Sequence, residues 1–428
     1  MRSNQIASSR QTLVANIAQQ ASAVATLLIL PNVLASGAFA ETVFVAVLMS
    51  FIALADLGLS YVYSRVVPAM ASREESETIR HWDRSVCSFG LLTSMVFAVF
   101  VSISYFVKFH SVLHAILLFP VAPLTFLTSF YVTRVSSLGD FLSYQRMIML
   151  RAVLAIGVLP LVLLWGITGW FIGTLMAAAI LLIYARDPSI TLSSFIDWPL
   201  VRANVGEGLM RCGITVMWLQ LLNVGRLYAS THYSHDKIAE YGIAASAYQS
   251  LAALIIAAFL PVSVETLRRF GHGADDAMRY VHRVAEQIAP WTLFGTIAVA
   301  EISPMLFRVF FPAYNLDTVM QVSLLSGVIF YPFFIIWGNC LVGARRFVPY
   351  IFLILLGLAT AWLVAAYFGS DTRGAAIGQF IGLLVYTLAM YLVAPKVLDV
   401  PVRLWLRAML VFSLTGGLGV AYWALRWL

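Results

Sequence analysis

The chain has 428 residues, of which 61% are hydrophobic and only 11% are charged, with a formal net charge of +7. An ordinary soluble domain carries about 25% charged residues, so this composition excludes a soluble globular protein. One transmembrane helix needs about 20 apolar residues, which leaves room for roughly thirteen spans. The sequence therefore predicts an all-α polytopic membrane protein.

The N-terminal part of the chain contains a first set of apolar runs. The opening ten residues are polar and carry Arg2 and Arg10, and the following run has no small-residue cleavage site, so we expect an uncleaved first span rather than a signal peptide. Hydrophobicity and breaks predict six spans, at residues 11–34, 42–68, 84–107, 112–133, 148–165 and 168–185. We expect residues 1–185 to form an N-lobe and the polar residues 186–206 a cytoplasmic linker.

A second set of apolar runs follows the linker. It predicts six more spans, at residues 207–228, 240–264, 285–311, 318–342, 347–368 and 374–395, which together form a C-lobe over 207–395. Residues 396–428 add a C-terminal helix, with a thirteenth span at 403–425. Six plus six spans favour a repeated architecture of two lobes.

The distribution of basic residues gives the orientation. If the N-terminus is cytoplasmic, most arginines fall in cytoplasmic loops or at cytoplasmic helix ends, Arg151 among them. The opposite side keeps only Lys108, Lys237, Arg308, Arg373 and Arg426, a strong positive-inside bias. The net positive charge therefore belongs to loops that contact anionic lipid, and we expect no nucleic-acid partner.

The external loops are too short to fold into a domain, which argues against an enzyme. The sequence contains no GxxxxGK[ST], no GxGxxG opening a helix, no HExxH and no GxSxG, so no catalytic residue is predicted and ATP-driven transport lacks its usual motif. Cys87, Cys212 and Cys340 lie far apart without a CxxC pattern, which favours neither a disulfide nor a metal site.

Ionisable side chains inside a span cost a few kcal/mol, so each needs a partner or a water-filled cavity. The seventh span is the most polar, and helical spacing places Arg211, Trp218 and Arg226 near one stripe, with the two arginines about 22 Å apart. We expect this stripe to face a cavity. The alternatives are that unseen carboxylates neutralise the arginines, that Arg226 lies near the far interface, or that Trp218 is a packing residue.

Three further ionisable residues have both a functional and a structural interpretation. Asp56, in the second span, either lines the lumen or satisfies a neighbouring helix, and Arg65 either faces the entry or extends to the headgroups. Glu301, in the ninth span, either lines the lumen or pairs with Arg308 on the same helix face. In contrast, Gly374, Gly378 and Gly382 form a GxxxGxxxG track that predicts close helix packing.

Several segments resemble a known family. Residues 16–65 (from NIAQQASA to LADLGLSYVYSR), with a kink at Leu57, Gly58 and Leu59, are similar to the first two spans of Wzx-type polysaccharide flippases. These belong to the multidrug/oligosaccharidyl-lipid/polysaccharide exporter superfamily. Residues 223–230 (NVGRLYAS), 238–251 and 302–347 resemble its seventh to tenth spans, although Gly225 stands where the family usually has Asp.

The resemblance implies a fold and a cargo. It implies two pseudo-symmetric six-helix lobes around a central cavity, in a multi-pass protein of the bacterial inner membrane. The implied substrate is an undecaprenyl-diphosphate-linked oligosaccharide, moved from the cytoplasmic to the periplasmic leaflet by alternating access. We expect Arg211, Arg226 and Arg65 to bind the diphosphate and Trp218 to stack on a sugar, with Asp56 or Glu301 available for proton or sodium coupling.

No cofactor is predicted, and the expected partners are the lipid-linked substrate, membrane lipids and other biosynthetic membrane proteins such as a polysaccharide polymerase. Three other functions stay open at this stage. The first is a multidrug exporter of the same fold, although an arginine-rich lumen would repel cationic drugs. The second is a membrane glycosyltransferase or polysaccharide polymerase, and the third is a scaffold for a biosynthetic complex.

Overall fold

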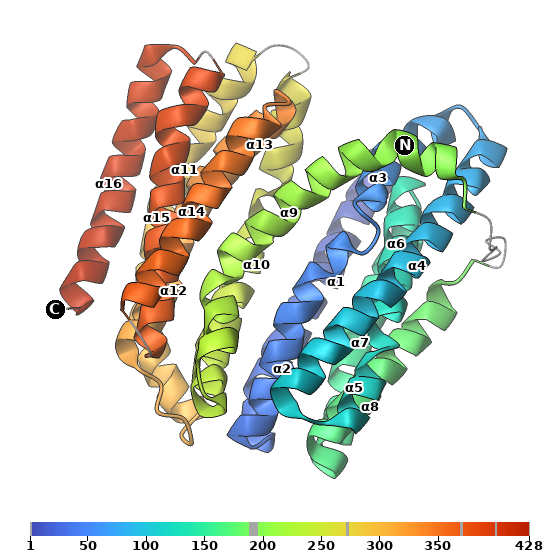
Figure 1. Ribbon diagram of the computed structural model, residues 1–428. Coiled ribbons are helices and arrows are strands. Elements are labelled where there is room, and N and C mark those ends of the chain that lie inside the picture. The colour runs from blue at the N-terminus through green and yellow to red at the C-terminus, as the bar shows by residue number, and fades with distance from the viewer. Residues whose placement is uncertain (1, 188–195, 271–273, 369–370, 399, 428) are drawn as a thin grey trace. The chain divides into compact units, whose positions relative to one another are not determined.

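The computed structural model describes residues 2–187, 196–270, 274–368, 371–398 and 400–427, and these residues are almost entirely helical (Figure 1). The prediction of an all-α fold is confirmed. In lipid a helix satisfies its backbone hydrogen bonds within its own segment, which explains why the described part of so apolar a chain is mostly helical. The chain forms two compact units, Met1–Val216 and Met217–Leu428.

The N-terminal unit contains eight α-helices, one 3-10 helix and the first half of a ninth α-helix. They are α1 (Arg2–Val33), α2 (Ser36–Met49), η1 (Ser50–Leu54), α3 (Leu59–Ser72), α4 (Ser76–Phe109), α5 (Val112–Leu118), α6 (Val121–Ser137), α7 (Phe141–Gly157), α8 (Leu159–Ala185) and α9 (Trp198–His232). Part of the linker predicted at 186–206 lies outside the described residues, and α9 begins at Trp198. The predicted domain boundaries stay a prediction.

The second span is broken where the sequence predicts a kink. Helix α2 tightens into η1 and ends, the chain turns at Leu57 (φ 51°) and Gly58 (φ 78°), and α3 begins at Leu59. A positive φ favours glycine, because a Cβ crowds the backbone in that region. Asp56, Leu57 and Gly58 form this turn, and the turn sets the direction in which α3 and its polar side chains leave it.

The fifth and sixth spans form a tight hairpin. The backbone of α8 leaves helical geometry at Gly166 (φ 59°, ψ −134°), so the spans separate where residues 148–165 and 168–185 were predicted to part. A Cβ on Gly169 would lie 1.9 Å from the carbonyl oxygen of Leu161, which shows how closely the two arms approach. Helix α7 and the first part of α8 therefore cross the unit together, up to this turn.

The C-terminal unit contains the rest of α9 and the helices that follow. These are α10 (His235–Phe270), α11 (Ala274–Phe310), α12 (Thr318–Ser326), η2 (Gly327–Phe330), α13 (Tyr331–Gly343), α14 (Phe347–Tyr367), α15 (Thr372–Val397) and α16 (Val402–Trp427). The predicted tenth span is thus built from α12, η2 and α13. The aromatic core of the C-terminal unit includes Tyr248 of α10 and Tyr331 of α13, whose hydroxyls lie 2.6 Å apart.

Two glycines of the GxxxGxxxG track pack against α14. A Cβ on Gly378 would lie 2.5 Å from the carbonyl oxygen of Ala361, and one on Gly382 would lie 2.7 Å from that of Gly357. At these separations only glycine lets the two backbones approach. The packing role predicted for the track is therefore confirmed at these two positions.

The last helix, α16, packs within the C-terminal unit. The indole N–H of Trp405 donates to the carbonyl oxygen of Tyr391 at 2.9 Å, and that of Trp423 donates to the Ser323 hydroxyl at 2.8 Å. The Trp423 ring also stacks on Phe380, with centroids 4.5 Å apart. Helix α16 is therefore an integral part of this unit.

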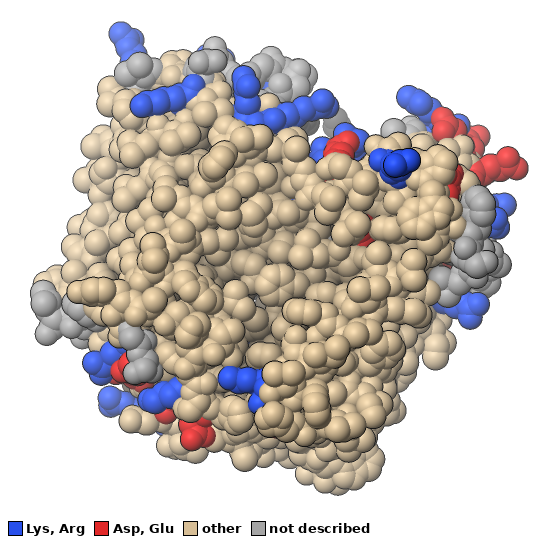
Figure 2. All heavy atoms as spheres, in the orientation of Figure 1, with Lys and Arg blue, Asp and Glu red and all other residues tan. Residues whose placement is uncertain are grey.

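The surface matches a multi-pass membrane protein. Among the described residues, seven helical segments are long and apolar enough to cross a bilayer, and two shorter apolar helices accompany them. On the face seen in Figure 2, charged side chains lie mostly near helix ends, while the middle of the helices is covered mainly by other residues. Large exposed hydrophobic side chains such as Leu164, Trp291 and Phe352 suit contact with lipid.

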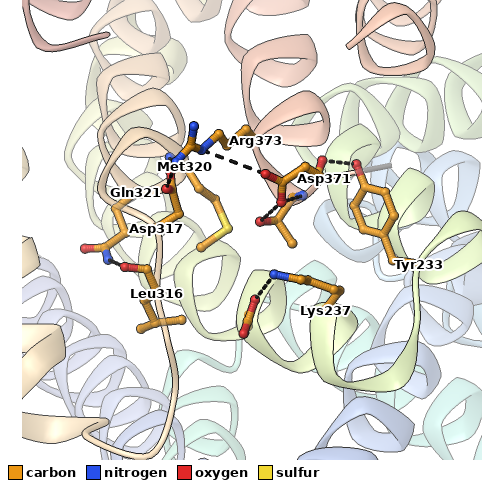
Figure 3. Close-up of polar contacts among 10 residues, drawn as sticks. Tyr233, Lys237, Leu316, Asp317, Met320, Gln321, Asp371 and Arg373 are labelled. Atoms are coloured by element: carbon orange, nitrogen blue, oxygen red, sulfur yellow. Dashed lines mark hydrogen bonds and ion pairs between the residues drawn. The ribbon is translucent and has the colours of Figure 1, made fainter. Parts of the chain in front are cut away.

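A polar cluster ties together one end of the C-terminal unit (Figure 3). Asp317 caps α12 and Asp371 caps α15, and Arg373 contacts both carboxylates, at 2.6 Å and 3.9 Å. Nearby, Lys237 pairs with Glu240 at 3.0 Å. Charges that cap helix starts and pair with each other stabilise helix ends, so helix capping and ion pairing explain this cluster without a ligand.

Candidate functional site

Two of the predicted arginines meet on a shared carboxylate in the N-terminal unit. Glu207 in α9 accepts from Arg65 of α3 at 2.8 Å, and its other oxygen lies 2.9 Å from Nε of Arg211. One carboxylate between two guanidinium groups leaves a net charge of +1. All three side chains are partly exposed, so this group can exchange its internal partner for an anionic ligand.

A close backbone crossing brings these residues together. A Cβ on Gly58 would lie 2.0 Å from the carbonyl oxygen of Gly208, and one on Gly208 would lie 2.7 Å from that of Leu57. The start of α3 therefore rests directly on α9, one residue after Glu207. Seven residues farther along α3, the side chain of Arg65 reaches Glu207.

Asp56 is first of all a turn residue. Its two carboxylate oxygens accept from the backbone N–H groups of Gly58 at 2.9 Å and Ser60 at 2.8 Å, which stabilises the start of α3. It also lines a cavity of about 400 Å³ between α3 and α6, along with hydroxyl side chains that include Ser60, Ser64 and Thr133. These two bonds satisfy the backbone of its own turn rather than a neighbouring helix, and its roles in the lumen and in coupling stay predictions.

A buried ion pair that we did not predict from sequence lies near this cavity. The carboxylate of Asp83 in α4 is fully buried, and it accepts from the Tyr63 hydroxyl and from Nε of Arg134, the latter at 2.8 Å. Arg134 also contacts Asp187 at 2.9 Å. Because each charge has a partner, we interpret this network as a structural tie between α3, α4 and α6.

Arg226, in the C-terminal unit, has a different environment. Only 8% of it is exposed, yet its guanidinium donates to neutral groups, the side-chain oxygen of Gln249 and the hydroxyl of Ser246, each at 2.7 Å. The amide of Gln249 in turn donates to Asn223. Among the described residues no carboxylate pairs with Arg226, and its Nε has no hydrogen-bond partner. A buried positive charge without a counter-ion is costly, so the site suits an anionic ligand.

The remaining predicted residues of this unit have packing contacts. Trp218 lies edge-on to Phe334, with ring centroids 6.2 Å apart. Glu301 accepts a hydrogen bond from the Tyr422 hydroxyl at 2.8 Å. The contact joins α11 to α16, which gives Glu301 a structural role, while its coupling role stays a prediction.

Gly225, the departure from the family pattern, has a steric reason. A Cβ there would lie 1.9 Å from the Tyr241 hydroxyl and 2.8 Å from the carbonyl oxygen of Ala375. The side-chain oxygen of Gln379 accepts from the N–H of Gly225 at 3.2 Å, and its amide donates to the carbonyl of Leu222 at 2.6 Å. This close packing leaves no room for an aspartate beside Arg226.

Comparisons with known proteins support the fold. No family model and no curated protein matches the chain. Among solved structures, the lipid II flippase MurJ in an inward closed conformation matches with a TM-score of 0.70 at 12% identity, over 98% of each chain. An inward-facing multidrug resistance transporter of the MATE family, from the MOP superfamily, matches with a TM-score of 0.64 at 15% identity, over 91% of this chain and 94% of that one.

A mutant of the MATE transporter VcmN from Vibrio cholerae matches with a TM-score of 0.58 at 14% identity, over 94% of this chain and 97% of that one. At such low identities these likenesses show the fold alone. The chain therefore has the fold shared by these flippase and transporter structures.

Proposed function

We propose that this chain is a flippase that moves an undecaprenyl-diphosphate-linked oligosaccharide from the cytoplasmic to the periplasmic leaflet, for surface polysaccharide biosynthesis. The observation that carries the proposal is Arg226, a buried guanidinium whose partners among the described residues are neutral. A diphosphate would supply the missing negative charge through charge-assisted hydrogen bonds. The fold shared with MurJ, a lipid II flippase, supports a lipid-linked cargo.

The second positively charged group has a complementary role. Arg65 and Arg211 are held by Glu207 when no ligand is bound, and an arriving diphosphate would replace Glu207 as their partner. When a diphosphate replaces Glu207 as the counter-ion, both arginines keep an anionic partner throughout. This arrangement would favour binding and release over permanent capture.

Coupling to a proton or sodium gradient would use an acidic residue that a cavity reaches. Asp56 meets this condition, because it lines the cavity between α3 and α6. Glu301 instead accepts a hydrogen bond from Tyr422 of α16, so we favour Asp56 of the two. The proposal of a flippase does not depend on this choice.

The proposal predicts where lipid-linked intermediates accumulate in a cell that lacks the protein. In a deletion strain, the oligosaccharide lipid should collect in the cytoplasmic leaflet, and expression of the native chain should restore its appearance in the periplasmic leaflet. Normal surface polysaccharide in the deletion strain, together with loss of drug efflux, would instead favour the multidrug exporter. Accumulation of flipped but unpolymerised intermediates would favour a polymerase.

A further inference from the structure

The N-terminal unit contains a charged cavity that belongs to neither group of arginines described above. It has a volume of about 250 Å³, is partly open, and is lined by residues of α1, α6, α7 and α8. Among the described residues that line it, Arg151 is the only charged one, and it is joined there by Thr26, Thr125, Thr128 and Thr174. All of these residues lie within the same unit.

Arg151 lies deep in its helix. The sequence predicts it at a cytoplasmic helix end, and in the structure α7 begins at Phe141, about 15 Å away along the axis at 1.5 Å per residue. The helical path continues through the first part of α8 to the turn at Gly166. Arg151 is therefore nearer the middle of this helical path than either end, and its side chain is exposed rather than packed into the unit. A charge that lies within a bilayer costs a few kcal/mol unless a partner or water compensates it.

No described carboxylate pairs with Arg151. Every Asp and Glu of the N-terminal unit is among the described residues, and within them Arg151 has neither an ion pair nor a hydrogen bond. The nearest comparable case is Arg134, which is held by two carboxylates. Arg151 thus lines the cavity without a described counter-ion, which leaves its guanidinium available to a ligand.

The threonines add directional donors. The hydroxyls of Thr26 and Thr128 donate to backbone carbonyls of their own helices, at 2.9 Å and 3.0 Å. Those of Thr125 and Thr174 have no hydrogen bond within the described residues, which leaves their protons available to a ligand in the cavity. A guanidinium fork with two free hydroxyl donors and no acid matches the oxygens of a phosphate group.

We propose that this cavity is a binding site for a phosphate group, presented either as free phosphate or on a lipid carrier. The ligand's charge would neutralise Arg151, and its oxygens would accept from the guanidinium and from Thr125 and Thr174. The volume of about 250 Å³ accommodates a phosphate with bound water, and excludes the bulk of an oligosaccharide. This site stands whether or not the chain moves a lipid-linked sugar.

The test measures ligand-dependent thermal stability of the purified full chain, because a ligand that binds only the folded state raises its midpoint. We compare the unfolding midpoints of the native chain and of Arg151→Gln under three conditions. These are sodium phosphate, a prenyl monophosphate lipid in nanodiscs, and sodium chloride at equal ionic strength. Arg146→Gln is the matched control, since Arg146 is an exposed arginine of the same helix outside the cavity. We expect at least one phosphate source to raise the midpoint of the native chain and of Arg146→Gln.

In Arg151→Gln the apparent affinity for that source should fall by about tenfold or more, the loss typical of a charge-assisted contact. The source that acts identifies the ligand as free or lipid-borne. Arg151→Lys keeps the charge but loses the bidentate guanidinium geometry, so its apparent affinity should lie between those of the native chain and Arg151→Gln. It replaces Arg151→Gln in the comparison if Arg151→Gln does not fold. Equal responses of the native and Arg151 variants to both phosphate sources, or an equal response to chloride, would overturn the proposal.

Discussion

The crossing of Gly58 and Gly208 allows a graded prediction. In Gly58→Ala the new methyl group would lie 2.0 Å from the Gly208 carbonyl oxygen and 2.7 Å from Cβ of Cys212, at a residue whose φ is +78°. Left-handed backbone costs an L-residue about 1–2 kcal/mol, and overpacking costs about 1–3 kcal/mol more. We therefore expect Gly58→Ala to destabilise the N-terminal unit by about 2–5 kcal/mol.

Two other alanine variants set the scale. In Gly208→Ala the closest atom is at 2.7 Å and φ is not positive, so only the overpacking cost of about 1–3 kcal/mol applies. In Gly37→Ala no atom lies within 4 Å, and the change should be nearly neutral. Thermal unfolding of the purified variants should give the order Gly58→Ala, Gly208→Ala, Gly37→Ala from least to most stable. A Gly58→Ala protein as stable as Gly37→Ala would refute the close crossing.

Three further predictions concern other parts of the molecule. Asp83→Ala should destabilise the protein by about 3–5 kcal/mol because it removes the fully buried carboxylate that pairs with Arg134 and accepts from the Tyr63 hydroxyl. Arg73→Ala, which breaks an exposed pair, should cost less than about 1 kcal/mol; thermal unfolding compares the two variants, and equal midpoints would contradict the prediction. Gly225→Ala should sharply lower the yield of folded protein through its clash with Tyr241, while Gly295→Ala, with no atom within 4 Å, should keep the native yield in size-exclusion chromatography. Glu207→Gln should tighten binding of a prenyl diphosphate lipid by freeing two arginines and slow its release, and unchanged affinity in a binding titration would argue against counter-ion exchange.

Much of the fold could be predicted from the sequence because its signals are local. Apolar runs identify the spans, the Leu57–Gly58–Leu59 kink coincides with the start of α3, and the break between 165 and 168 coincides with the turn at Gly166. These features depend on residues within a few positions of each other. Positive φ and close helix contact both select glycine, so glycine spacing carries this information.

The polar partners could not be predicted in the same way. Arg65 and Glu207 lie 142 residues apart in the chain, and helical periodicity shows which face a residue occupies without showing what packs against that face. The contact of Glu301 with Tyr422 has the same origin. The polar residues before Arg151 were predicted to lie outside a helix, whereas they form the first turns of α7.

The central claim is that Arg226 binds the charged group of a lipid-linked cargo, and transport by reconstituted protein tests it most directly. The native chain, Arg226→Ala and Arg226→Lys are placed in vesicles with a fluorescent prenyl diphosphate oligosaccharide, and its transfer between leaflets is measured. Arg279→Ala, at an exposed arginine of α11, is the matched control. The account predicts near-native transfer by the control, reduced transfer by Arg226→Lys and the largest loss in Arg226→Ala, because lysine keeps the charge but not the fork. Native rates in both Arg226 variants, with folded protein confirmed, would contradict it.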